Sequence, residues 1–173
     1  MKRGGFLLMY LLLMAVQILA GNYCNFTQHF TLTILPVMVL CIPIRYGTIF
    51  AMCAAFATGF CCGFLGDGFL GLAILALVPV GLGRKALIQL VFGSEVFSRG
   101  EDISFRRQGV PKMTLATLIA TAVYMAIYVW ADGAGTLSFR FCLTKFLLST
   151  LGSTAVSLFA AHLLTSDDLG KWK

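Results

Sequence analysis

The chain is built from apolar segments that are long enough to cross a lipid bilayer and are separated by mostly short polar connections. A membrane-spanning helix needs roughly 20 mostly apolar residues. The predicted segments cover residues 4–20, 30–44, 46–65, 69–85, 113–131 and 137–164, with 86–92 as a candidate interfacial turn. The second segment contains Pro36 and Pro43, and the fourth meets the basic pair Arg84-Lys85. The sequence therefore predicts an all-α integral membrane bundle of about six transmembrane helices.

The composition agrees with lipid as the solvent of this chain. Of its 173 residues, 59% are hydrophobic and only 12% are charged, whereas roughly a quarter of the residues in a soluble domain are charged. Residues 1–173 are predicted to form a single transmembrane domain with one long polar loop at about 93–112. The net charge of +6 does not indicate a nucleic-acid partner, because the basic residues lie at the ends of apolar segments.

The basic residues are distributed unequally between the two predicted sides of the membrane. If the N-terminus lies in the cytoplasm, eleven of the thirteen lysines and arginines fall on the inner side, and only Arg140 and Lys145 fall on the outer side. Cytoplasmic loops of membrane proteins carry such an excess of positive charge. We therefore expect a multi-pass protein with both termini and the loop 93–112 in the cytoplasm.

Asp67 is the one acidic residue at the centre of an apolar region. An ionisable residue in a membrane segment is a functional candidate by default. Three interpretations stay open: Asp67 meets water in a glycine-rich turn at the outer face, it pairs with Arg140 or Lys145, or it is a ligand or proton site. An unpaired charge at mid-bilayer would cost roughly 2.5–3.5 kcal/mol, so we expect Asp67 to be paired or hydrated.

Small residues recur at a spacing of four, which places them on one face of a helix. The pairs are Gly59/Gly63, Ala51/Ala55 and Ala116/Ala120. Such pairs let two helix backbones approach closely in a membrane. They indicate either ordinary packing within the chain or a face that binds the helix of a partner protein.

No group of residues points to catalysis. The acids are scattered, and the sequence contains no Ser-His-Asp set, H-E-x-x-H motif or phosphate-binding loop. General acid–base catalysis needs a titratable group within reach of the reacting atom. We therefore expect no enzyme activity, no metal site and no cofactor. Cys24 and Cys142 are the cysteines predicted near one membrane face, so a disulfide between them stays open.

Four stretches resemble the bacterial rod shape-determining MreD family. They are Leu35-Pro36 in the second segment, Arg45-Tyr46-Gly47 before the third, Gly63-Phe64-Leu65-Gly66-Asp67 at its end, and Gly71 beyond it. The order of the spans and the charged loop extend the resemblance in layout over most of the chain. The sequence departs from the family pattern after Gly47, where Thr48-Ile49-Phe50 replaces a run of Ser, Thr and Asn.

The resemblance implies a non-catalytic scaffold of the cell-elongation machinery in the bacterial inner membrane, beside an MreC-like membrane protein, the actin-like MreB and the wall-synthesis enzymes. The candidate functional or packing residues are Gly59, Gly63, Gly66, Asp67, Gly71, Arg140 and Lys145. The chain also resembles in layout the substrate-binding S-component of energy-coupling factor vitamin transporters, although the first segment lacks their Ala-x-x-x-Ala docking motif. A proton-coupled carrier that uses Asp67 is a third interpretation.

Overall fold

The computed structural model describes residues 3–23, 31–67, 70–93, 109–133 and 138–165, and within these ranges it contains helices and no strand. The α-helices are α1 (Arg3–Tyr23), α2 (Leu35–Leu40), α3 (Gly47–Cys62), α4 (Leu70–Phe92), α7 (Val110–Gly133) and α8 (Phe139–Thr165). A 3₁₀ turn, η1 (Ile44–Tyr46), precedes α3, and a π-helical turn, η2 (Gly63–Asp67), follows it.

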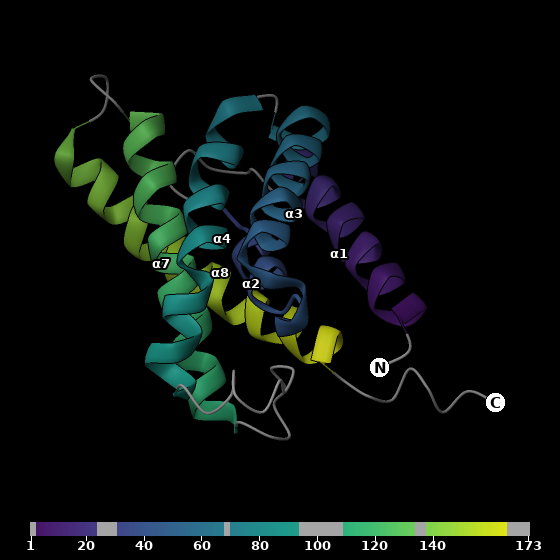
Figure 1. Ribbon diagram of the computed structural model, residues 1–173. Helices are drawn as coiled ribbons and strands as arrows, with labels where there is room; N and C mark the ends of the chain where they lie inside the picture. Colours follow the sequence, from purple (N-terminus) through teal and green to yellow (C-terminus); the bar gives the residue numbers. More distant parts are fainter. Residues whose placement is uncertain (1–2, 24–30, 68–69, 94–108, 134–137, 166–173) are drawn as a thin grey trace.

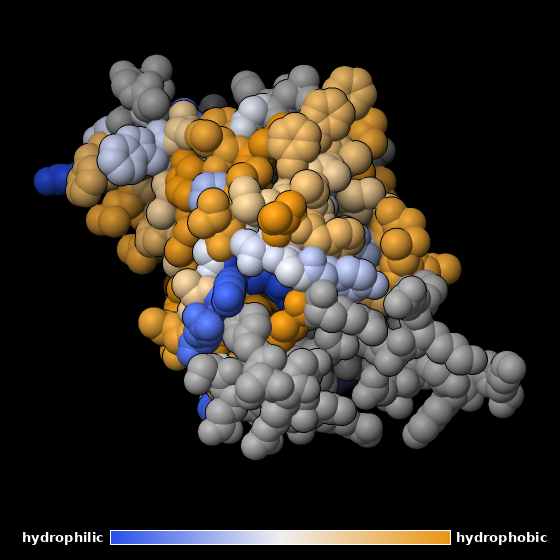
Figure 2. Space-filling model, in the orientation of Figure 1, coloured by the Kyte–Doolittle hydropathy of each residue, from blue (hydrophilic) through white to orange (hydrophobic). Residues whose placement is uncertain are grey.

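Four of these stretches are long and apolar enough to cross a membrane: Gly47–Gly66, Gly71–Phe92, Val110–Gly133 and Phe139–Leu164. A shorter apolar stretch, Phe6–Asn22, lies in α1. Much of the outer surface is apolar (Figure 2), and outward-facing Ile49, Leu90 and Phe159 are between 67% and 79% exposed. The predicted all-α membrane bundle is confirmed.

Helices that follow one another in the chain pack side by side: α3 against α4, α4 against α7, and α7 against α8 (Figure 1). α8 crosses obliquely behind the others, and α2 lies in the middle of the bundle. The beginnings of α1, α3 and α7 and the ends of α4 and α8 lie at the lower end in this view. Because α1 ends at the upper end and α3 begins at the lower end, the segment that contains α2 returns along the bundle between them. We refer to residues 31–46 as the second crossing of the bundle.

This second crossing differs from the continuous helix predicted over residues 30–44. α2 has only 6 residues, a length of about 9 Å, and residues 31–34 before it are not helical. Pro36 lies in the first turn of α2, where its missing N–H removes no hydrogen bond. Pro43 disfavours helical backbone at the residue before it and so ends the helix. The segment nevertheless forms the core, since residues 33–43 are all buried.

The fourth segment is longer than predicted. α4 passes through Pro79 and continues to Phe92, so residues 86–92 are a helical continuation rather than an interfacial turn. Packed neighbours let a membrane helix tolerate an internal proline. Arg84 consequently lies inside the helix and is only 5% exposed, whereas the adjacent Lys85 is exposed.

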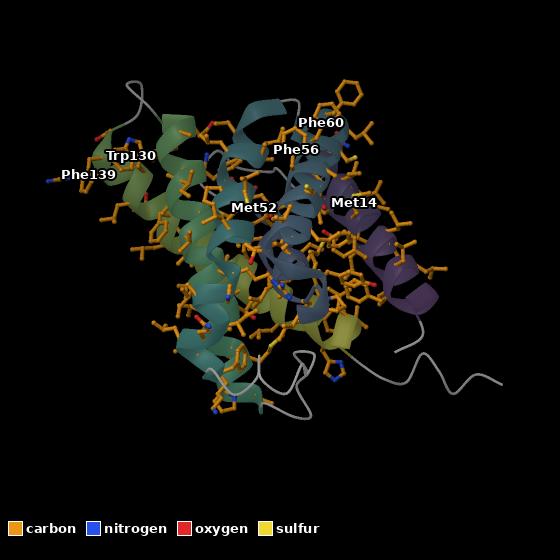
Figure 3. The ribbon with its side chains drawn as sticks, in the orientation of Figure 1. Met14, Met52, Phe56, Phe60, Trp130 and Phe139 are labelled. Carbon is orange, nitrogen blue, oxygen red and sulfur yellow. The ribbon has the colours of Figure 1, made fainter. Side chains whose placement is uncertain are left out.

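Aromatic side chains mark both ends of the bundle. Trp130 near the end of α7 is 81% exposed, and Phe139 at the start of α8 is 80% exposed; both lie at the upper end (Figure 3). Tyr46, just before α3 at the opposite end, is 38% exposed. Tryptophan and tyrosine are enriched where membrane proteins meet the two polar surfaces of the bilayer. Trp130 and Tyr46 therefore indicate the levels of these surfaces.

Candidate functional site

A non-helical chain segment, residues 31–34, precedes α2 and is held against α8 by three serines. The Thr31 N–H donates to Ser149 Oγ and the Thr33 N–H donates to Ser153 Oγ, each at 3.0 Å. The Ser153 hydroxyl donates to the Thr31 carbonyl, and the Ser157 hydroxyl donates to the Thr33 carbonyl, each at 3.3 Å. The serines of a helix thus bond to this segment as a neighbouring β-strand would.

The spacing of the serines explains why a helix can do this. Four residues of an α-helix rise by about 6 Å, and two residues of an extended strand rise by about 6.6 Å. Serines at every fourth position of α8 therefore match Thr31 and Thr33, two residues apart in the segment before α2, and the same side of its backbone faces each hydroxyl.

The backbones of Leu32 and Ile34, which alternate with the two threonines, bond to α1. The Gln17 side chain, in a residue that is 6% exposed, accepts the Ile34 N–H at 2.9 Å and donates to the Leu32 carbonyl at 3.3 Å. The Thr33 hydroxyl accepts the Leu35 N–H at 3.3 Å, where α2 begins. Non-helical backbone at membrane depth is tolerated only where protein or water satisfies its polar groups. Here α1 and α8 satisfy the segment from opposite sides.

Arg84 holds the other end of the second crossing. Its Nε donates to the Leu40 carbonyl at 3.2 Å, and its Nη2 donates to the Ile42 carbonyl. The first carbonyl belongs to the last residue of α2 and the second lies two residues beyond it, where the end of a helix leaves acceptors without intrahelical donors. A cation also interacts favourably with the C-terminal end of a helix dipole. Arg84 is therefore a buried cap at the end of α2.

A recess lies beside Arg84, at the lower end of the bundle. It has a volume of about 170 Å³ and is lined by Ile44, Gly47, Thr48, Arg84 and Lys85. Gly47 has φ of 70°, a left-handed conformation that glycine adopts without strain, and a Cβ atom there would meet nothing within 4 Å. The recess therefore joins two cationic residues to the start of α3.

An apolar groove of about 250 Å³ lies between α4 and α7. Pro79, Gly83 and Ala86 line it from α4, and Ile119 and Val123 line it from α7. A Cβ atom at Gly83 would meet nothing within 4 Å. Both helices are long and apolar enough to span a membrane, and the groove is an apolar hollow between them.

The small-residue pairs lie inside the bundle. Ala51, Ala55, Ala116 and Ala120 are 0% exposed, and Gly59 and Gly63 are buried. A Cβ atom at Gly59 would lie 3.1 Å from Ile74 Cα, and one at Gly81 would lie 3.2 Å from the Ala51 carbonyl oxygen and from Ala55 Cβ. At the contact between α3 and α4, these small residues therefore pack within the chain.

The glycine-rich turn η2 packs against the end of α1. The Asn22 side-chain amide donates to the Leu65 carbonyl at 2.9 Å and to the Ile18 carbonyl at 3.1 Å. A Cβ atom at Gly66 would lie 3.7 Å from Ile18, so this glycine lies close to α1. The backbone of Asp67 ends the turn, but its side chain lies outside the described part of the protein. The three interpretations of Asp67 stay predictions.

Lys145 forms an ion pair that joins α7 to α8. Its Nζ lies 2.7 Å from Asp132 Oδ2, and the two side chains are 10% and 28% exposed respectively. Asp67 was a predicted partner of Lys145, whereas the structure pairs Lys145 with Asp132. Arg140, the other predicted outer cation, is exposed. Cys142 has a free thiol, and Cys24 lies outside the described residues.

Sequence reasoning missed the residues that hold the second crossing. Ser149, Ser153 and Ser157 carry a usable signal, because three hydroxyls on one face of an apolar helix need polar partners inside a membrane. Gln17, in the first segment, carries the same signal. Arg84 was interpreted only as a topology residue, since Lys85 follows it and the helix was expected to end there.

Fold and contacts define the class of this protein as an all-α integral membrane bundle whose second crossing is broken and bonded to its neighbours. Comparison of the chain with protein-family models, with curated proteins and with solved structures finds no match. Function is therefore inferred from the residues and their arrangement alone.

Proposed function

We propose that the protein is a non-catalytic scaffold of the bacterial cell-elongation machinery, which binds transmembrane helices of MreC-like proteins and wall-synthesis enzymes in the inner membrane, with both its termini in the cytoplasm. The observation that carries this proposal is the apolar groove between α4 and α7. The resemblance to the MreD family supplies the identity of the partners.

The groove suits a helix better than it suits a polar substrate. The residues that line it have no polar side chains; they include Pro79, Gly83, Ala86, Ile119 and Val123. Helices associate in membranes mainly through close packing, which small residues permit. Gly83 leaves open space above its Cα atom, and Ala86 three residues on adds a second small residue to the groove.

The interior supports the same function. Gln17, Ser153 and Arg84 are buried polar residues that bond to the backbone of the second crossing. These contacts hold the bundle in one shape, so the outer faces of α4 and α7 are presented on a rigid body. A rigid body with an open groove binds a partner without first losing conformational freedom.

A matched pair of glycine substitutions tests the proposal. Gly83→Leu fills the groove, whereas Gly71→Leu places the same side chain on the same helix, where a Cβ atom also meets nothing within 4 Å. We expect Gly83→Leu to reduce co-purification of an MreC-like partner about tenfold, equivalent to about 1.4 kcal/mol. Gly71→Leu should retain the partner, and both variants should reach the membrane at equal levels.

A photo-crosslinking residue at Leu90, beside the groove, identifies the occupant directly. Crosslinks to a membrane protein of the elongation machinery support the proposal. Crosslinks only to lipid, or equal partner retention by both glycine variants, contradict it. Co-purification with transporter ATPases together with vitamin binding would replace the scaffold by an S-component.

A further inference from the structure

The recess at the start of α3 has the chemistry of an anion site. It is lined by Arg84 and Lys85 from α4 and by Thr48 from α3, and its volume is about 170 Å³. A water molecule occupies about 30 Å³ in the liquid, so the recess has room for a group larger than water. On the face that Figure 2 shows, hydrophilic residues lie around a hollow towards the lower end, below the apolar body.

The two cations differ in a way that suits a phosphate group. Arg84 is 5% exposed, and its bonds to the Leu40 and Ile42 carbonyls fix the guanidinium at the wall of the recess. Lys85 is exposed, and its long side chain can adjust its position. Arginine and lysine both bind phosphates, arginine through its planar fork and lysine as a point charge.

The start of α3 adds to this positive character. Tyr46 precedes the helix, and its side chain makes no capping hydrogen bond to the first turn of α3. The N-terminal end of a helix carries a partial positive charge and favours anions. Gly47 keeps the approach open, since it carries no Cβ atom. The Thr48 hydroxyl lines the same recess and can donate a hydrogen bond.

The position of the recess selects a lipid as the source of the phosphate. The apolar span Gly47–Gly66 begins at the recess, and Tyr46 marks the membrane surface at this level. Apolar surface adjoins it directly, because Ile49 is 79% exposed and Phe50 is 50% exposed. A lipid bound with its headgroup in the recess would lay its acyl chains along these residues.

We propose that this recess binds the phosphate group of an anionic membrane lipid, held by Arg84 and Lys85 at the start of α3. Basic pockets between transmembrane helices are a recurrent form of headgroup site. The site lies between α3 and α4, and the groove of the proposed scaffold lies between α4 and α7, so either can fail without the other.

The test compares two exposed lysines at the same end of the bundle. Lys85→Gln removes the adjustable cation of the recess, and Lys112→Gln removes an exposed cation of α7 that does not line it. The purified full-length chain is exchanged into nanodiscs of phosphatidylcholine alone or with added phosphatidylglycerol, and retained lipid is measured by native mass spectrometry. We expect Lys85→Gln to lower phosphatidylglycerol retention about tenfold and Lys112→Gln to leave it unchanged.

Equal losses in the two variants would show general attraction of anionic lipid and would overturn the proposal. Displacement of phosphatidylglycerol by inorganic phosphate at similar affinity would also overturn it, because the site would then take a soluble anion. Thr48→Val serves as a second variant, since it removes a hydroxyl of the recess without changing the net charge. Its expected effect is a smaller loss of phosphatidylglycerol in the same direction, and unchanged retention would count against the site.

Discussion

The second crossing and the α3–α4 hairpin lie side by side in the bundle, yet they are stabilised in different ways. In the hairpin, regular helices satisfy their own backbone groups, and glycine and alanine let them pack closely. In the second crossing, only α2 is α-helical, and side chains from α1, α4 and α8 bond to the remaining backbone. Where no water is available, each irregular stretch of chain requires such partners.

The comparison predicts opposite sensitivities. The hairpin should tolerate the loss of polar groups but respond strongly to added volume, because its backbones are already in contact. The second crossing should respond to the loss of single hydrogen-bonding groups, because each one satisfies a buried backbone atom. Four sets of substitutions test this difference.

The largest effect is expected at Arg84. Arg84→Met keeps much of the side-chain length but leaves the Leu40 and Ile42 carbonyls without their donor. A buried acceptor that loses its partner costs about 1–3 kcal/mol, so we expect the free energy of unfolding in bicelles to fall by about 4 kcal/mol. Lys85→Met is the control, since exposed substitutions usually change stability by about 0.5 kcal/mol or less. Equal stability of the two variants would remove the role assigned to Arg84.

Added volume in the hairpin should have the next largest effect. A Cβ atom added at Gly59 would lie 3.1 Å from the backbone of Ile74, so Gly59→Leu must push α3 away from α4. Overpacking of this kind costs about 1–3 kcal/mol. Gly71→Leu provides the comparison, because nothing lies within 4 Å of its Cβ position. If the two leucine variants unfold at the same denaturant concentration, close packing does not hold this hairpin.

A smaller effect is expected from the three serines of α8 that bond to the second crossing, Ser149, Ser153 and Ser157. Ser153 accepts from the Thr33 N–H and donates to the Thr31 carbonyl, and Ser153→Ala removes both bonds. Interhelical hydrogen bonds in membranes contribute about 0.6 kcal/mol on average, so we expect a loss of about 1 kcal/mol. Amide hydrogen exchange at Thr33 should accelerate. Thr144→Ala, whose hydroxyl bonds only within its own helix, should leave that exchange rate unchanged.

The smallest effect is expected from the Lys145–Asp132 ion pair. It lies at the end of the bundle, and the Asp132 side chain is 28% exposed. Partly exposed ion pairs contribute about 1 kcal/mol or less. A double-mutant cycle with Lys145→Met and Asp132→Asn should give a coupling energy of that size. A much larger coupling would place this pair among the contacts that stabilise the core.

The sequence alone determined the class of fold and the order of its parts. Apolar runs near the length of a bilayer, with few charges, leave a helical bundle as the structure that satisfies its own backbone in lipid. The distribution of Arg140 and Lys145 against the other basic residues also gave an expected topology. Spacing-four glycines and alanines were expected to pack helices closely, either within the chain or against a partner, because this rule depends only on helix geometry.

Only the arrangement of the helices in space shows that the second segment is a broken helix and that side chains of neighbouring helices bond to its backbone. Pro36 and Pro43 were visible in the sequence, but a proline in a membrane segment is compatible with a kinked helix or with a broken one. The outcome depends on whether other helices offer partners to the freed backbone groups. Gln17, Ser153 and Arg84 do so here from three different helices. Because these residues are far apart along the chain, no local sequence pattern predicts that they bond to the same segment.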